Sequence, residues 1–123
     1  MKRSQEKVRV LLLEDSREDA DIFRRYADRC EHYDIEIDHR RFADGVIERV
    51  ADGEYDALFV DYRLKQEQTG LDVLKSARAC CPHVPVVVLT GVGDESLAVE
   101  IMKAGATDYL SKGDFDSESL ERS

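Results

Sequence analysis

Three acidic side chains, one hydroxyl and one ammonium lie just beyond short apolar runs of this sequence. They are Glu14, Asp15, Asp61, Thr90 and Lys112, and the runs before them cover 8–13, 57–60, 86–89 and 109–110. The carboxyl ends of parallel strands joined by crossover connections lie along one edge of a sheet. If the runs form such strands, these residues, which are far apart in the sequence, meet in one small site.

The chemistry of this set is that of a divalent cation and a phosphoryl group. Three carboxylates held close together repel one another unless a cation lies among them, and Mg²⁺ uses few carboxylates together with water. Asp15 would bind Mg²⁺ directly, Glu14 through a water molecule, and Asp61 would supply another oxygen. An aspartate can act as a nucleophile and hold an acyl phosphate, while Lys112 and Thr90 would contact phosphoryl oxygens.

Each motif alone also has an ordinary structural interpretation. An aspartate such as Asp61 can end a strand and cap the next turn, and acids such as Glu14 and Asp15 are favoured at a helix N-terminus by the helix dipole. The combination is more specific than its parts, because each motif ends a different strand. The set therefore indicates phosphoryl transfer to Asp61.

The composition limits the location and the partners of the protein. The 123 residues suit one domain spanning 1–123, and a formal charge of -9, from 27 acids and 18 bases, disfavours direct binding to nucleic acid or an anionic membrane. No stretch resembles a signal peptide or a membrane span, so we expect a cytoplasmic protein. The three cysteines lack the spacing of a metal or redox motif and are expected to be reduced thiols.

Alternating strand and helix patterns would position the polar residues. Strand-like segments cover 8–13, 35–42, 57–61, 86–90 and 107–111. Helical spacing and capping residues predict helices over 19–30, 46–50, 71–77 and 95–104, with a further helix beginning at 116–120. This alternation indicates an α/β fold with a parallel sheet covered on both faces. The truncated last helix suggests that the natural protein continues beyond Ser123, where an output domain would lie.

The chain resembles the receiver domains of two-component response regulators over essentially its whole length. The motifs that carry the resemblance are Leu-Leu-Leu-Glu-Asp-Ser at 11–16, Leu-Phe-Val-Asp-Tyr-Arg-Leu at 58–64, Val-Leu-Thr-Gly at 88–91 and Gly-Ala-Thr-Asp-Tyr-Leu-Ser-Lys at 105–112. The resemblance implies a flavodoxin-like, doubly wound sheet of five parallel strands in the order 2-1-3-4-5. Five helices would flank this sheet, and the last of them is truncated in this sequence.

The family pattern assigns roles to the acidic residues. Asp61 would be the phosphate acceptor, and Mg²⁺ would be held by Glu14, Asp15, Asp61 and the backbone carbonyl of Arg63. The phosphoryl donor would be a phosphohistidine on a sensor histidine kinase or on a histidine phosphotransfer protein. The domain would be a phosphoacceptor rather than an enzyme, although it would later help to hydrolyse its own acyl phosphate. The side chain of Arg63 would be placed to tune the phosphoryl lifetime.

The same pattern predicts a conformational switch. Thr90 would be the switch hydroxyl, Lys112 the phosphate-sensing lysine, and Tyr109 the aromatic side chain whose rotamer follows phosphorylation. These movements would change the face made by the helix over 95–104, the final strand and the truncated last helix. A homodimer could form through this face.

Two positions depart from the family pattern. Gly113 follows Lys112 where the family commonly has proline, so a cis peptide is not expected there. The loop over 64–70 lacks a proline that is often present and is one residue longer than usual. We therefore expect greater mobility in this loop, with an effect on partner selection.

Three other functions fit part of the pattern. Phosphatases of the haloacid-dehalogenase type also use a strand-end aspartate and Mg²⁺, but they need an acid two residues later, where this chain has Arg63. A flavin or nucleotide binder is suggested by Thr-Gly-Val-Gly-Asp at 90–94, although acids rather than a phosphate loop follow the first strand. A docking module on the same fold, active without phosphorylation, is the third alternative.

Overall fold

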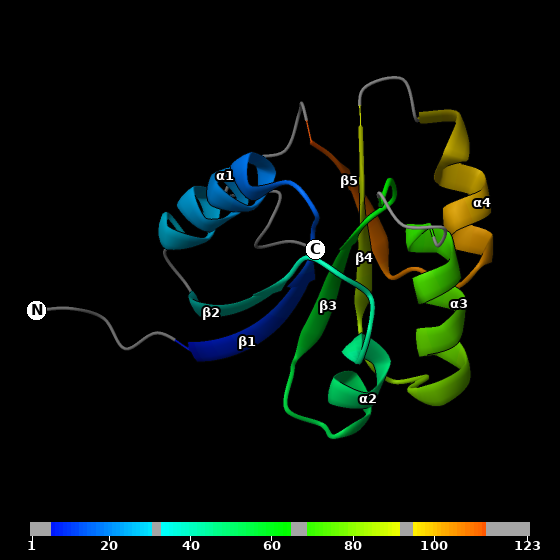
Figure 1. Cartoon of the computed structure of the whole chain (residues 1–123), viewed down its shortest axis with the longest axis horizontal. Helices are drawn as coiled ribbons and strands as arrows, with labels where there is room; N and C mark the ends of the chain where they lie inside the picture. Colours follow the sequence, from blue (N-terminus) through cyan, green and yellow to red (C-terminus); the bar gives the residue numbers. More distant parts are fainter. Residues whose placement is uncertain (1–5, 31–32, 65–68, 92–94, 113–123) are drawn as a thin grey trace, which may run out of the picture.

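The structure, a computed structural model, describes residues 6–30, 33–64, 69–91 and 95–112. Its elements in chain order are β1 (Glu6–Leu13), α1 (Arg17–Asp28), β2 (Tyr33–Arg40), α2 (Val46–Ala51), β3 (Ala57–Asp61), α3 (Gly70–Cys80), β4 (Val86–Thr90), the 3-10 helix η1 (Glu95–Leu97), α4 (Ala98–Lys103) and β5 (Asp108–Ser111) (Figure 1). The expected alternation of strands and helices is confirmed over these residues.

The five strands form one parallel sheet in the order β2-β1-β3-β4-β5, as expected. α1 covers one face of this sheet, and α2, α3 and α4 cover the other (Figure 1). Side chains of successive strand residues point to opposite faces. In β1, Leu11 and Leu13 therefore join the core under α2–α4, while Val10 and Leu12 join the core under α1.

Both cores are closely packed against the sheet. Leu74 of α3 and Ile101 of α4 are fully buried on one face. On the other face, the rings of Phe23 in α1 and Phe59 in β3 meet edge to face with their centroids 5.1 Å apart. The helices are therefore held to the sheet from both sides, and the carboxyl edge of the strands is left for polar side chains.

The helix α1 begins earlier than its apolar pattern indicated. Ser16 is its N-cap, and the Ser16 hydroxyl accepts a hydrogen bond from the N–H of Asp19 at 3.2 Å. Capping by Ser16 makes Arg17 the first helical residue, so Asp19 is the third residue of the helix instead of the first. This shift brings the Asp19 side chain to the edge of the sheet where β1 ends.

Other boundaries differ from the expected ones by a few residues. β2 covers Tyr33–Arg40 instead of 35–42, because every one of its residues pairs with β1. The segment expected as one helix over 95–104 contains the 3-10 turn η1 followed by α4, and Gly105, with φ of 105°, follows the end of that helix. The helix expected at 116–120 and the departure at Gly113 lie outside the described residues, as does most of the loop over 64–70.

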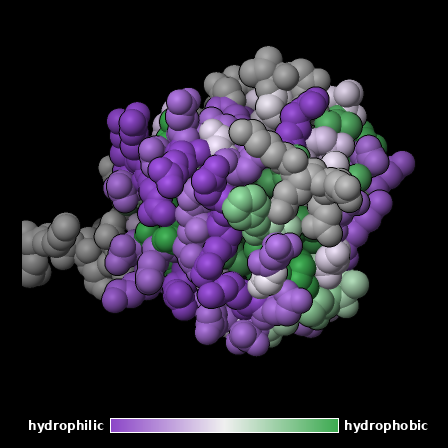
Figure 2. All heavy atoms as spheres, in the orientation of Figure 1, coloured by the Kyte–Doolittle hydropathy of each residue, from purple (hydrophilic) through white to green (hydrophobic). Residues whose placement is uncertain are grey.

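The surface is dominated by polar residues on the face drawn in Figure 2, and hydrophobic residues gather on the side where α2–α4 lie. Val99 and Met102 of α4 are 65% and 43% exposed, so Met102 does not belong to the core. Cys30, Cys80 and Cys81 form no disulfide bond with one another. Within the described ranges, no helix has the length and apolar character needed to cross a membrane.

Candidate functional site

The five polar residues singled out in the sequence lie at the carboxyl edge of the sheet. Glu14 and Asp15 directly follow β1, Asp61 and Thr90 end β3 and β4, and Lys112 follows β5. Backbone hydrogen bonds continue the sheet to this edge, because the N–H of Glu14 donates to Arg40 O at 3.0 Å and that of Lys112 donates to Thr90 O at 2.8 Å. The expected convergence of the strand ends is therefore present.

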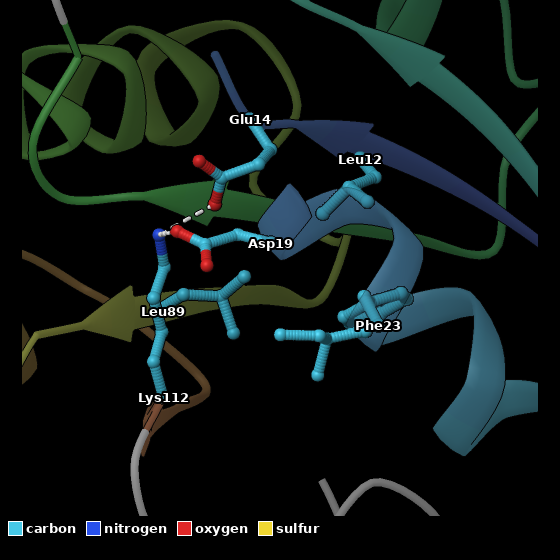
Figure 3. Close-up of a pocket in the computed structure, with 7 residues that line it drawn as sticks. Leu12, Glu14, Asp19, Phe23, Leu89 and Lys112 are labelled. Carbon is cyan, nitrogen blue, oxygen red and sulfur yellow. Dashed lines mark hydrogen bonds and ion pairs between the residues drawn. The ribbon is translucent and has the colours of Figure 1, made fainter. Parts of the chain in front are cut away.

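The ammonium of Lys112 is the centre of an ionic cluster. Its Nζ atom lies 2.7 Å from Glu14 Oε2, 2.8 Å from Asp19 Oδ2 and 3.2 Å from Asp61 Oδ2. Figure 3 shows Glu14 and Asp19 converging on this nitrogen from the end of β1 and the first turn of α1. A lysine ammonium has three N–H donors, and each of them has a carboxylate oxygen within reach here.

Burial makes the negative charges of this cluster costly. Glu14 is 1% exposed and Asp61 is 4% exposed. Burial raises the pKa of Glu14 to about 7, against the hydrogen bond and charge of Lys112, and burial also raises the pKa of Asp61. Burial acts against the charged form of Lys112, but hydrogen bonds to Asp19 and Glu14 and the charge of Asp61 raise its pKa above the usual range. The lysine is therefore held as a cation.

The acidic residues fit a divalent cation. Glu14, Asp15 and Asp61 each offer a carboxylate oxygen, and these oxygens lie within 4.8 Å of one another. Glu14 Oε2 is buried and lies 2.7 Å from Lys112 Nζ, its ion-pair partner. Carboxylate oxygens are the ligands that Mg²⁺ and Ca²⁺ take in proteins. A metal ion among them would offset the repulsion that burial strengthens.

Neighbouring backbone groups hold Asp61 in place. The N–H of Arg63 donates to Asp61 Oδ1 at 3.3 Å, while the side chain of Arg63 is exposed. The N–H of Tyr62 donates to Leu89 O at 2.8 Å and that of Gly70 donates to Tyr62 O at 2.8 Å. The chain after Asp61 is therefore tied both to β4 and to the start of α3.

The two expected switch residues lie beside the cluster but not in it. Thr90 is buried, and its hydroxyl donates to the carbonyl of Leu110 at 3.4 Å. Tyr109 is 36% exposed, and its N–H donates to Asp108 Oδ1 at 2.8 Å. The structure thus brings Glu14, Asp15, Asp61 and Lys112 together, while it pairs the Thr90 hydroxyl with the backbone of β5.

Three residues of this region were missed by the sequence reasoning. Asp19 was given no role at the site, yet it binds Lys112. His39 was also given no role, but its Nε2 atom lies 2.6 Å from the carbonyl oxygen of Glu14. Gly70 was treated only as part of a loop, although it packs against the backbone of Asp61. The one feature of the sequence that could have indicated a role at the site was the acidic side chain of Asp19, shortly after the pair Glu14 and Asp15.

Two curated proteins are similar in sequence to this chain. The chain is 35% identical over 101 residues to the regulatory protein LuxO of Vibrio cholerae, covering 82% of this chain and 21% of that protein. It is 53% identical over 53 residues to the photosynthetic apparatus regulatory protein RegA of Rhodovulum sulfidophilum, covering 43% of this chain and 28% of that protein. The chain therefore spans less than a third of the length of these relatives.

Solved structures with the same fold include receiver domains. The signal receiver domain of a protein assigned as the Luxo repressor of Vibrio parahaemolyticus superimposes with a TM-score of 0.76 at 28% identity, covering 94% of this chain and 85% of that one. A response regulator receiver domain protein from Clostridium thermocellum, at 23% identity, has the same fold with a TM-score of 0.77 over 94% of this chain and 89% of that one. The model of the response regulator receiver domain matches residues 10–122, and this chain accordingly belongs to that family of two-component signalling domains.

Proposed function

We propose that this domain accepts a phosphoryl group on Asp61. The observation that carries the proposal is the position of the Asp61 carboxylate, which is buried at the carboxyl edge of the sheet beside both the acidic pair and the ammonium of Lys112. A nucleophile in this position has a cation site on one side and a fixed positive charge on the other. Phosphoryl transfer depends mainly on such positioning and charge neutralisation.

The transfer forms one bond and breaks another. A carboxylate oxygen of Asp61 attacks the phosphorus of a phosphohistidine, and the bond between phosphorus and the imidazole nitrogen breaks with its electron pair on the nitrogen. Glu14, Asp15, Asp61 and the carbonyl of Arg63 would hold Mg²⁺, which when bound would neutralise charge on the phosphoryl oxygens. Lys112 contacts a phosphoryl oxygen directly, because its Nζ atom already lies 3.2 Å from Asp61 Oδ2.

The switch requires Thr90 to change its partner. Its hydroxyl, which donates to Leu110 O in this structure, would turn to a phosphoryl oxygen on Asp61. The freed space beside β5 would let the half-exposed Tyr109 turn inward. The face made by α4, β5 and the last helix would then differ between the two states, and a homodimer could form through it.

The partner we propose is a sensor histidine kinase or a histidine phosphotransfer protein in the cytoplasm. Residues 1–123 would act as one receiver domain of a longer response regulator, since the segments that match this chain make up only 28% and 21% of the two relatives. Direct contact with nucleic acid would belong to another part of such a protein, because the formal charge of this chain is -9. Hydrolysis of the acyl phosphate by the domain itself would end the signal.

Intact-mass analysis after incubation with acetyl phosphate and Mg²⁺ tests the proposal. One labile phosphoryl adduct is expected on the wild-type chain, and it should be absent from Asp61→Asn and from a sample in which EDTA has removed the metal. A folded wild-type protein that takes no phosphoryl group from acetyl phosphate or from a histidine phosphotransfer donor would contradict it. The phosphorylation-independent docking module would then be the better description.

A further inference from the structure

Lys112 has a third carboxylate partner that the proposed function does not use. Asp19 Oδ2 accepts a hydrogen bond from Lys112 Nζ at 2.8 Å, across 93 positions of sequence. Figure 3 shows the Asp19 side chain reaching this nitrogen from the first turn of α1. Because Glu14 and Asp61 lie within reach of the same ammonium, all three of its N–H donors can be engaged before any phosphoryl group arrives.

A phosphoryl oxygen must therefore displace one of the three carboxylates from Lys112. Glu14 is a poor candidate, since its side chain is 1% exposed and water cannot take the place of the ammonium around it. Asp61 is the acceptor itself. The side chain of Asp19 is 40% exposed, so water can replace the lysine around its carboxylate at little cost.

The surroundings of Asp19 also allow this exchange. Its backbone is fixed in the first turn of α1, where its N–H donates to the Ser16 hydroxyl, so only the side chain has to turn. A cavity of about 30 Å³, lined by Asp19 and Lys112 together with Ile22 and Phe23, is large enough for a water molecule. The carboxylate can therefore leave Lys112 without unfolding the helix.

We propose that Asp19 is a positioning residue that holds Lys112 in the resting state and competes with the phosphoryl group for it. This inference rests on the proposed function of Asp61. In the resting state, the Asp19–Lys112 ion pair keeps the ammonium close to Glu14 and Asp61. After phosphorylation, the lysine exchanges Asp19 for a phosphoryl oxygen, and the free energy of the broken ion pair opposes the phosphorylated state.

The test compares Asp19→Asn with Glu18→Gln, which removes one negative charge from an exposed side chain in the same helical turn. Calorimetric titration with beryllofluoride, a phosphoryl mimic, is carried out at constant Mg²⁺. Asp19→Asn should bind the mimic roughly threefold to fivefold more tightly than wild type, as expected for loss of a competing, partly exposed ion pair. Glu18→Gln should stay within about twofold of wild type.

A second readout separates this role from a purely structural one. Asp19→Asn should melt at a lower temperature than wild type in the resting state, and the difference should vanish at saturating beryllofluoride. Equal affinities of Asp19→Asn and Glu18→Gln, or a melting difference that persists in the bound state, would overturn the inference while leaving the role of Asp61 intact. If wild type does not bind the mimic and Asp61 takes no phosphoryl group, the proposed function and this inference fail together.

Discussion

Gly70, the first residue of α3, packs directly against the backbone of Asp61, the last residue of β3. A Cβ atom on Gly70 would lie 2.7 Å from the Cα atom of Tyr62 and closer still to the carbonyl oxygen of Asp61. Backbone atoms cannot rotate out of the way as a flexible side chain can. The absence of a side chain at Gly70 therefore lets α3 begin where it does, with Asp61 at the edge of the sheet.

Gly70→Ala is expected to displace the end of β3 or the start of α3. The overlap should lower the free energy of unfolding by about 1–3 kcal/mol. Phosphoryl uptake from acetyl phosphate should also slow, because small displacements of a reacting group are costly. Ser76→Ala, at an exposed position of α3, is the control and should leave both quantities nearly unchanged. Urea denaturation and initial uptake rates give the two measurements, and a Gly70→Ala protein equal to this control would contradict the expectation.

The imidazole of His39 supports the backbone at the acidic pair. A carbonyl oxygen only accepts hydrogen bonds, so His39 Nε2 donates to Glu14 O. Loss of this donor in His39→Ala should loosen the turn after β1 and weaken Mg²⁺ binding by about threefold to fivefold. His39→Gln, which keeps an N–H near the same point, should retain most of the affinity.

Isothermal titration calorimetry suits the measurement, since the chain contains no tryptophan to report the binding. His83→Ala, at an exposed position after α3, is the matched control. An affinity that is the same in His39→Ala and in His83→Ala would mean that the hydrogen bond to Glu14 does not position the metal ligands.

The carboxylate of Asp38 makes stability depend on pH. It lies 3.2 Å from Arg40 Nε and 3.8 Å from Arg49 Nη1, and it accepts a hydrogen bond from the Tyr55 hydroxyl. Burial acts to raise the pKa of Asp38, but these hydrogen bonds and positive charges outweigh burial and lower the pKa below its ordinary value of 3.8. The carboxylate therefore stabilises the fold above about pH 4, and this contribution is lost as the pH falls through the lowered pKa.

Asp38→Asn should accordingly be less stable than wild type at pH 7, by roughly 0.5–1 kcal/mol for a partly exposed group. The difference should shrink as the pH falls below 3.8, because the wild-type carboxylate loses its charge as the pH passes through its lowered pKa. Urea denaturation at several pH values measures it, with Asp34→Asn, at an exposed position of the same strand, as the control. A difference that is constant from pH 7 to pH 3 would exclude the ion pairs as its source.

Packing under α1 is expected to dominate the stability of its face of the sheet. Phe23 is 1% exposed and meets Phe59 edge to face, whereas Phe42 is 57% exposed. Phe23→Ala should cost about 3–5 kcal/mol through lost burial and the cavity left behind. Phe42→Ala should cost less than about 0.5 kcal/mol. Similar losses of stability in the two variants, measured by thermal or urea unfolding, would contradict this assignment of the core.

The order of the elements and the convergence of their ends could be predicted from the sequence. Apolar runs at 8–13, 57–61 and 86–90 have the composition of strands buried on both faces, and helical spacing separates them. Parallel strands joined by crossover helices necessarily direct their carboxyl ends to one edge. That rule alone brings Glu14, Asp61 and Lys112 together. Their residue types and positions in the chain were therefore sufficient to predict that they share one site.

The partners of the individual polar atoms were decided only by the tertiary structure. Asp19 contacts Lys112 because α1, capped by Ser16, directs this residue of its first turn towards the end of β5. The rotation of a helix about its axis relative to a neighbouring strand cannot be read from the spacing of its apolar residues. His39 reaches Glu14 because β2 pairs with β1 in one particular register. Register, helix rotation and rotamer choice depend on packing between elements far apart in the chain, so their outcome is a property of the assembled fold.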